Sequence, residues 1–322
     1  MTKTGKRAAF YHDLAVMLEA GLPILRSLDT VTAGLQGNMK KVFSDVRKSV
    51  SQGESISEAM AKHKKAFGKL DVMLVHAAEI SGNLPECFKS LTNWYEFRNR
   101  LHRTIKAGLI LPIFILNIGA FIIPLPGMLL GNITFVGYFF RVFKVLAFFY
   151  ISFLIILVIY KLMRSERGLS VILDIFLLRL PILGKALLQL SICRYCRAFN
   201  MLYKAGVPIT ESLAQATELA GNSVVSGLFE GGAISAAAGN TACDGFSNRL
   251  PSEYLNLWQI GEETGELEKT VDKIAEIAGD NAYLLLSLCA RWFPIIIYVL
   301  ICIWMILQVF RGYANMYSMR GL

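Results

Sequence analysis

Two kinds of pattern alternate along the chain. In some stretches apolar residues recur at helical spacing, as at Phe88, Leu91 and Tyr95, and again at Val271 and Ile274. Other stretches are long apolar runs with almost no charge, and the alternating runs typical of β-strands are lacking. The pattern therefore predicts an all-α integral membrane protein in which helical bundles alternate with transmembrane helices.

The first apolar run has no charged residue from Ala107 to Phe140. One straight helix of that length would extend about 51 Å, against a hydrocarbon core of about 30 Å. The segment Pro124–Gly127 interrupts the run, because proline removes a backbone donor and disfavours helix in the preceding residue. We therefore predict three transmembrane helices at 106–126, 142–162 and 291–311, with residues 127–141 as an external loop. Whether 127–140 enters the membrane stays open.

Basic residues near the ends of these spans predict the orientation. Five lysines and arginines lie between residues 89 and 106 and three between 161 and 167, whereas two lie between 107 and 160. Cytoplasmic flanks of transmembrane helices carry the excess of basic residues. We therefore expect a cytoplasmic N-terminus, cytoplasmic helical bundles at 1–105 and 163–290, and an external tail at 312–322.

Composition agrees with a membrane protein and excludes other classes. Of the 322 residues, 54% are hydrophobic and 18% charged, which is unlike an intrinsically disordered chain or a disulfide-rich secreted module. The formal net charge of +9 is concentrated in residues 1–106. A basic face beside a membrane is typical of contact with anionic lipid or of cytoplasmic retention. No nucleic-acid-binding signature accompanies the charge, so we expect membrane lipid and no nucleic acid as a partner.

Three short motifs occur twice, in the same order and about 185 residues apart, which predicts two duplicated domains. The pairs are Ala20-Gly-Leu-Pro-Ile24 with Ala205-Gly-Val-Pro-Ile209, Ser55-x-x-Glu58 with Thr241-x-x-Asp244, and Glu79-x-x-Gly-x-Leu84 with Glu262-x-x-Gly-x-Leu267. In the first motif the glycine suits the left-handed end of a helix, and the proline suits the first turn of the next helix. The second motif is typical of a helix start, and the glycine of the third suits another helix stop before a long helix.

The repeated positions are our candidates for motif or partner contacts. They are Gly21, Pro23, Glu79 and Gly82 in the first copy and Gly206, Pro208, Glu262 and Gly265 in the second. A carboxylate in the last turn of a helix opposes the helix dipole, so Glu79 and Glu262 require a compensating partner. Two interpretations remain open: each accepts hydrogen bonds from the N-terminus of the following helix, or each contacts a partner protein or a cation.

Catalytic patterns are absent from the sequence. There is no phosphate-binding Gly-x-x-x-x-Gly-Lys-Ser/Thr loop, the four histidines lack metal-binding spacing, and Cys193-x-x-Cys196 has no second pair. No ionisable residue falls within a predicted span apart from boundary positions, which argues against an ion-coupled transporter. We expect no catalytic residue, cofactor or metal, and no enzyme activity.

The order of helical domain, two spans, duplicated helical domain and terminal span resembles the inner-membrane platform proteins of type IV pilus and type II secretion machines, the type II secretion F family. The motifs that carry the likeness are Leu14-x-x-Met-Leu-x-Ala-Gly-Leu-Pro-Ile24, Glu79-x-x-Gly-x-Leu84, Leu180-Pro-Ile-Leu-Gly184, Arg194-x-x-Arg-Ala-Phe199 with Ala205-Gly-Val-Pro-Ile209, and Gly261-Glu-Glu-Thr-Gly-Glu-Leu267.

This resemblance implies a platform in the bacterial inner membrane that couples a hexameric secretion ATPase in the cytoplasm to pilin or pseudopilin subunits in the bilayer. It also implies contacts with other inner-membrane assembly proteins and self-association into a homo-oligomer. It does not separate a pilus from a secretion system. An alternative is a membrane transporter or channel subunit with cytoplasmic regulatory bundles, although three spans without intramembrane charge do not favour it.

Overall fold

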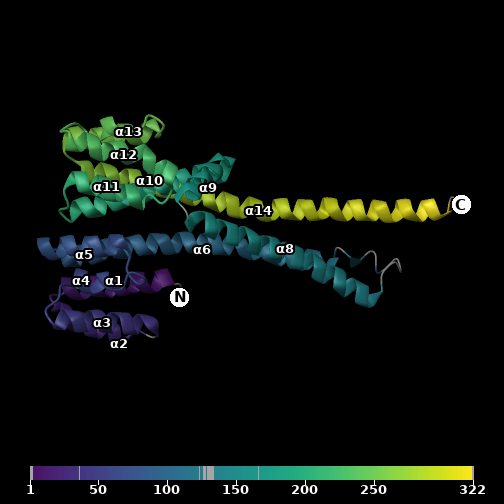
Figure 1. Cartoon of the computed structure of the whole chain (residues 1–322), viewed down its shortest axis with the longest axis horizontal. Coiled ribbons are helices and arrows are strands. Elements are labelled where there is room, and N and C mark those ends of the chain that lie inside the picture. Colours follow the sequence, from purple (N-terminus) through teal and green to yellow (C-terminus); the bar gives the residue numbers. More distant parts are fainter. Residues whose placement is uncertain are drawn as a thin grey trace. The chain divides into compact units, whose positions relative to one another are not determined.

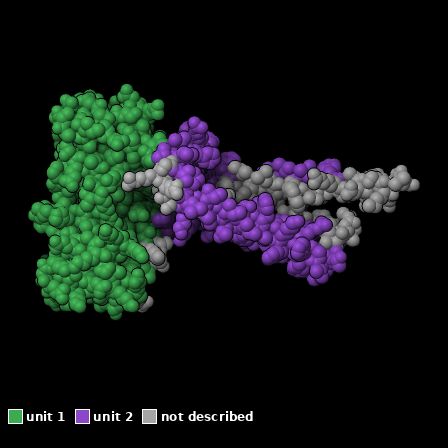
Figure 2. All heavy atoms as spheres, in the orientation of Figure 1, with its two compact units in different colours: residues 1–101, 186–282 green, residues 102–185, 283–322 purple. Residues whose placement is uncertain are grey.

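The computed structural model describes residues 3–35, 37–122, 124–125, 128, 134–165 and 167–320 (Figure 1). Every regular element in these ranges is a helix, which confirms the all-α prediction. The chain divides into two compact units (Figure 2). Unit 1 joins residues 1–101, here called the first bundle, with residues 186–282, the second bundle; unit 2 contains residues 102–185 and 283–322.

The helices fall into three groups along the chain. The first group is α1 (Lys3–Glu19), α2 (Ile24–Ala33), α3 (Asn38–Ser51), α4 (Ile56–Ala61) and α5 (Lys69–Ser81). The second is α6 (Leu84–Ile122), α8 (Phe135–Ser165) and α9 (Arg167–Arg179). The third is α10 (Pro181–Lys204), α11 (Ile209–Leu219), α12 (Ser223–Ala237), the 3₁₀ turn η1 (Cys243–Gly245), α13 (Ser252–Thr264) and α14 (Leu267–Arg320).

The Ala-Gly-x-Pro-Ile motifs form tight corners, as predicted. Gly21 has φ +79° and Gly206 has φ +87°, the left-handed conformation that glycine adopts without a steric penalty. Beyond each glycine a backbone amide reaches back to the preceding helix, at 3.0 Å from Leu22 to the carbonyl of Met17 in the first corner. The prolines differ slightly from the prediction. Pro23 and Pro208 are the N-cap residues of α2 and α11, one position before the first turn.

Aromatic side chains fill the core of each bundle. In the first bundle the rings of Phe10 and Phe43 stack with centroids 3.6 Å apart. In the second bundle the rings of Tyr195 and Phe229 stack at 3.7 Å, and the buried Trp258 lies against the same cluster. These rings come from helices far apart in sequence, so burying them closes each bundle.

In unit 2, helices α6 and α8 pack together through a small buried cluster of Ala120, Tyr138 and Val142. The hydroxyl of Tyr138 donates a 2.7 Å hydrogen bond to the carbonyl of Phe121. Within unit 2, most of the remaining apolar side chains described on these two helices are exposed. Within the described residues α6 and α8 are long and apolar enough to cross a membrane, and their exposed apolar surfaces suit contact with lipid.

Polar and small residues in the first predicted span take part in this packing. The amide of Asn117 donates to the hydroxyl of Tyr150 at 3.0 Å. A methyl group on Gly108 would come within 2.3 Å of the side chain of Ala290, so the backbones of α6 and α14 approach closely there.

The helices only partly follow the predicted segment boundaries. Residues 135–141, assigned to an external loop from the sequence, are helical, because the contacts of Tyr138 with α6 stabilise the start of α8. Residues 126 and 127 of the predicted Pro124–Gly127 break lie outside the described residues. The predicted third span, 291–311, falls within α14, where many side chains lie outside the described set, so the count of three spans stays a prediction.

Candidate functional site

Glu79, in the last turn of α5, holds the N-terminus of α4. Its carboxylate accepts hydrogen bonds from the backbone amides of Ile56 at 2.5 Å and Ser57 at 3.1 Å, and from the Ser57 hydroxyl at 2.5 Å. The first amides of a helix have no partner within the helix, and its N-terminus carries partial positive charge. Glu79, which lies outside α4, therefore supplies the acceptor for the first backbone amides of that helix. We call Glu79, Ile56 and Ser57 the Glu79 corner.

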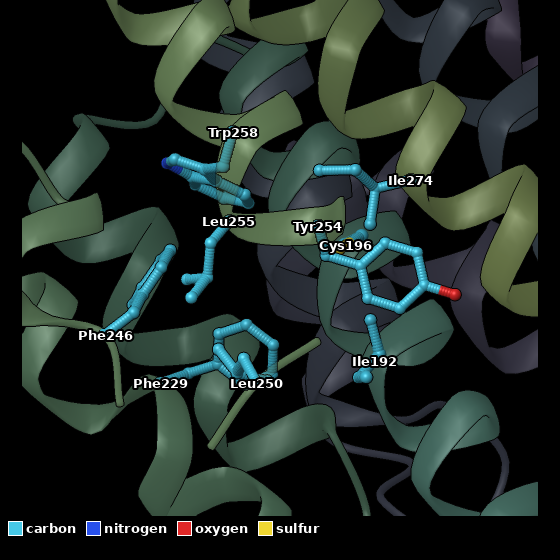
Figure 3. Close-up of a pocket in the computed structure, with 9 residues that line it drawn as sticks. All are labelled: Ile192, Cys196, Phe229, Phe246, Leu250, Tyr254, Leu255, Trp258 and Ile274. Carbon is cyan, nitrogen blue, oxygen red and sulfur yellow. The ribbon is translucent and has the colours of Figure 1, made fainter. Parts of the chain in front are cut away.

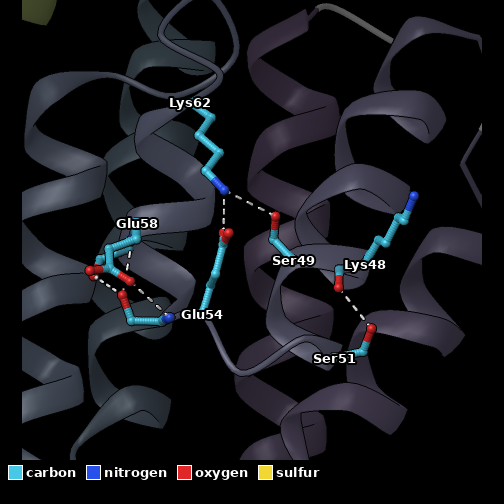
Figure 4. Close-up of polar contacts among 8 residues, drawn as sticks. Lys48, Ser49, Ser51, Glu54, Glu58 and Lys62 are labelled. Carbon is cyan, nitrogen blue, oxygen red and sulfur yellow. Dashed lines mark hydrogen bonds and ion pairs between the residues drawn. The ribbon is translucent and has the colours of Figure 1, made fainter.

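The sequence before α4 supports the same corner. Ser55 and Glu58 form the predicted capping box, each side chain bonding the other residue's backbone amide at 3.2 Å (Figure 4). Lys62, just after the end of α4, pairs with Glu54 in the preceding loop and lies 3.5 Å from the Ser49 hydroxyl (Figure 4). The hydrogen bond from Lys62 is the main reason that the pKa of Glu54 lies below its usual value.

Glu262, near the end of α13, makes the corresponding contact in the second bundle. Its carboxylate accepts hydrogen bonds from the amides of Ala242 at 2.7 Å and Cys243 at 3.1 Å. We call these three residues the Glu262 corner. The segment that they hold is the single 3₁₀ turn η1, and the bond from Asp244 to the Thr241 hydroxyl is long, at 3.4 Å. The expected helix start after Thr241 is therefore a short turn.

The first of our two interpretations placed each glutamate at the N-terminus of the helix that follows it, and the structure differs. Each contacts a segment that precedes its own helix in the chain, not the helix that follows. Gly82 and Gly265 instead end α5 and α13 in the left-handed conformation, with φ +75° and +74°, as predicted. The chain therefore passes directly into α6 and α14 and leaves the carboxylates facing back into the bundle.

Glu79 and Glu262 bind backbone groups of their own bundles, whereas the side chains next to them in sequence face outward. Ile80, beside Glu79, is 75% exposed, and Glu263, beside Glu262, is also exposed. Both oxygens of Glu79 and Glu262 already accept hydrogen bonds. The described residues contain no cluster of three metal-ligating side chains. A partner contact through the motif residues themselves stays a prediction.

Within unit 1 the two bundles meet at the long helices. The guanidinium group of Arg197 on α10 lies 4.2 Å from the ring centroid of Phe97 on α6, a cation–π contact. A methyl group on Gly279 of α14 would lie 3.2 Å from the Cys193 sulfur and 3.5 Å from Phe97. Three long helices, α6, α10 and α14, therefore converge around Arg197.

The sequence analysis missed a buried polar network in the first bundle. Asp71 accepts hydrogen bonds from the Tyr95 hydroxyl at 2.6 Å and from the Gly68 amide at 2.9 Å, and Arg7 donates to the Tyr95 hydroxyl at 3.2 Å. Burial raises the pKa of Asp71, and these hydrogen bonds oppose that shift. The signal was present as Gly68-x-x-Asp71, an acid in the first turn of a helix that lacks a Ser or Thr cap.

The cysteine pair and the one cavity described near it offer no catalytic chemistry. Cys193 and Cys196 are buried free thiols on α10, and burial raises the pKa of both, which keeps them protonated and unreactive. A cavity of about 10 Å³ lies between Cys196 and Trp258 (Figure 3). Its other walls are Ile192, Phe229, Phe246, Leu250, Tyr254, Leu255 and Ile274. This space approaches that of one water molecule and holds no substrate.

Known proteins match this chain over two ranges, one on each side of the second predicted span. The family profile for type II secretion system protein F matches residues 10–130 and 195–310. A type IV pilus assembly protein PilC of Thermus thermophilus is 28% identical over 291 residues, which cover 84% of this chain and 71% of that protein. The PilC protein of Pseudomonas aeruginosa is 26% identical over 306 residues, 85% of this chain and 80% of the relative. A type II secretion system protein F of Xanthomonas campestris is 23% identical over 287 residues, with coverages of 83% and 71%.

Proposed function

The chain belongs to the type II secretion system protein F family, and from this premise we propose that it is a non-enzymatic inner-membrane platform that couples a cytoplasmic secretion ATPase to the assembly of pilin or pseudopilin subunits. The carrying observation is the family match, which includes both bundles and reaches the apolar parts of α6 and α14. The relatives are named for type IV pilus assembly and type II secretion, the two kinds of machine in which we place it.

We further propose that the two bundles are duplicated cytoplasmic domains and that the chain crosses the membrane three times. The paired motifs and the similar Glu79 and Glu262 corners support the duplication. The lysine and arginine distribution supports a cytoplasmic N-terminus. Helices α6 and α8 provide two of the spans, and residues 291–311 of α14 would provide the third.

The long helices suit a protein that transmits movement. Helix α6 continues without a break from the bundle residue Leu84 to Ile122, about 58 Å at the usual rise per residue. Helix α14 likewise begins in the second bundle at Leu267 and continues to Arg320. A continuous helix carries a rotation or displacement that a flexible linker would absorb. The left-handed turns at Gly82 and Gly265 would then set the direction in which each long helix leaves its bundle.

Topology is the first test of this proposal. Reporters fused after residues 105, 135, 230 and 322 would be compared in a bacterial host. We expect cytoplasmic signals at 105 and 230 and external signals at 135 and 322. An external signal at 230 would place the second bundle away from a cytoplasmic ATPase and would overturn the proposal.

Coupling is the second test, made with the full chain in membrane vesicles and a hexameric secretion ATPase from the same genome. We expect the ATPase to co-sediment with vesicles that contain the chain. The variant Arg103→Pro breaks α6 and should retain ATPase binding while abolishing pilus or pseudopilus assembly. The matched control Arg103→Ala removes the charge but keeps the helix and should assemble normally. Assembly that survives Arg103→Pro would show that α6 does not transmit the movement.

A further inference from the structure

Helix α9 begins almost where the membrane-spanning candidate α8 ends. Only residue 166 separates Ser165, the last residue of α8, from Arg167, the first of α9, and the two helices pack against each other within unit 2. Lys161 is the first charged residue after the apolar run of α8, which marks the approach to the membrane surface. If α8 crosses the membrane, as the proposed function requires, α9 is held within a few residues of the headgroup region.

One face of α9 is apolar and exposed. Ile172, Ile175 and Phe176 lie at helical spacing and are 59%, 41% and 65% exposed. Leu173 and Asp174, on the other side of the helix, are buried. Soluble surfaces rarely present adjacent apolar side chains of this size without a partner. The face therefore requires an apolar medium that the unit itself does not supply.

The exposed charges that the structure describes around this face have one sign. Among the side chains that the structure describes from residue 161 to residue 185, the exposed charged ones are Lys161, Arg179 and Lys185, all basic. The described acidic side chain in this range, Asp174, is buried. Arg179 lies in the last turn of α9, one turn beyond Phe176, where a long side chain can keep its charge at the level of lipid phosphates. Basic residues beside an apolar helical face are typical of binding to an anionic membrane surface.

The corner after α9 holds this face in a defined direction. Gly184 in α10 packs so closely on the end of α9 that a methyl group there would lie 2.0 Å from the carbonyl oxygen of Leu178. The Gly184 amide also donates a 2.8 Å hydrogen bond to the carbonyl of Leu180. This is the Leu180-Pro-Ile-Leu-Gly184 motif, and its geometry sets how α9 joins α10.

From these observations we propose that α9 is an interfacial helix, whose Ile172, Ile175 and Phe176 enter the acyl boundary of the bilayer while Arg179 binds anionic headgroups. The inference rests on α8 crossing the membrane. It adds a lipid contact that the spans alone do not supply. The basic side chains beside the apolar stripe favour an anionic lipid surface as the occupant of this face.

Photocrosslinking in the full chain tests this contact directly. The photoreactive residue benzoylphenylalanine would replace Phe176, and in separate proteins Phe153 of α8 or Ile234 of α12, which are 56% and 71% exposed. Each protein would be reconstituted into vesicles of phosphatidylcholine and phosphatidylglycerol, irradiated and analysed by mass spectrometry. Phe153 is the control for a membrane span, and Ile234 is the control for an exposed apolar residue of a bundle.

We expect lipid adducts at position 176 in a yield close to that at 153 and at least about tenfold above that at 234. Adducts at 153 without adducts at 176 would overturn the inference and leave the membrane placement of α8 intact. No lipid adduct at either position would overturn both. A crosslink from 176 to a second copy of the chain or to another protein would overturn the inference in favour of a protein interface.

The headgroup contact is tested by removing one charge. With benzoylphenylalanine at 176, Arg179→Gln should lower the ratio of phosphatidylglycerol to phosphatidylcholine adducts about fivefold, as expected for one basic residue at a membrane surface. The matched control is Lys204→Gln, which removes the basic residue in the last turn of α10 and should leave the ratio unchanged. An unchanged ratio in Arg179→Gln would show that α9 does not select anionic lipid.

Discussion

At the Glu79 corner the carboxylate accepts three hydrogen bonds from the first residues of an α-helix, whereas at the Glu262 corner it accepts two from the start of a 3₁₀ turn. In both corners the donors are two consecutive backbone amides. The carboxylate therefore binds backbone, and the segment that supplies it can differ in sequence and even in helix type. Ser57 adds its hydroxyl to the first corner, and Cys243 in the second has no equivalent donor to the carboxylate.

The cores behind the corners differ more strongly. The first bundle buries the Asp71, Tyr95 and Arg7 network, and the second buries the aromatic cluster around Trp258. A buried carboxylate requires every hydrogen bond to be in place, while an aromatic cluster requires only close packing. We conclude that the shared corners define how the chain turns, and that each bundle fills its interior by a different chemistry.

The largest effect should come from the aromatic core. Trp258→Ala removes a fully buried ring that lies 4.9 Å from Phe199 and 5.0 Å from Phe246, and should lower the stability of the second bundle by about 3–5 kcal/mol. Hydrogen exchange of the full chain would show the loss in α10–α13, with α1–α5 little changed. Trp258→Phe keeps part of the ring and should lose less. Equal loss in both bundles would show that they unfold as one unit.

Removing the corner carboxylates should have the next largest effect. Glu79→Ala leaves three donors without their acceptor and should increase local opening of α4 by about 2–3 kcal/mol. Glu262→Ala leaves two donors and should have a smaller effect on η1. The variants Glu79→Gln and Glu262→Gln keep one acceptor oxygen, so their local opening should lie between that of the original chain and that of the alanine variants. The comparison would fail if Glu262→Ala were the more damaging change.

The helix-ending glycines should behave alike in the two bundles. Gly82→Ala and Gly265→Ala place a side chain at φ +75° and +74° with open space around it, so conformational strain alone should reduce stability by about 1–2 kcal/mol in each. Gly34→Ala is the control, because Gly34 has φ −78° and alanine adopts that conformation freely. Thermal unfolding of the full chain in detergent would rank the three variants. Unequal losses of stability at 82 and 265 would indicate different strain at the two helix ends.

The smallest effect should be a pH dependence confined to the first bundle. Because the folded pKa of Asp71 is raised, the folded state binds its proton more tightly than the unfolded state does. The stabilisation that protonated Asp71 contributes is therefore complete at low pH. It is lost as pH rises above the usual aspartate pKa of about 3.9 and through the raised pKa of the folded state. Exchange of α5 amides, corrected for intrinsic rates, should show this trend, and Asp71→Asn should remove it. A trend that persists in Asp71→Asn would assign it to another group.

Much of the fold could be predicted from local patterns. The positive φ values at Gly21, Gly82, Gly206 and Gly265 follow from the need for a left-handed residue between two helices, and this need is visible in the sequence. The capping box at Ser55 and the helix starts at Leu84 and Leu267 are equally local. Such features depend on a few adjacent residues, so their spacing is sufficient to predict them.

Other features depend on contacts between distant residues. No local pattern indicates that Glu79 reaches back to Ile56, that Asp71 pairs with Tyr95, or that residues 135–141 form the start of α8. The sequence by itself determined the helix ends, the apolar runs and the repeated motifs, because these depend on backbone conformation and hydrophobicity. Only the tertiary structure decided which amides the carboxylates bind and which apolar face of α9 stays exposed, because both depend on which helices pack together.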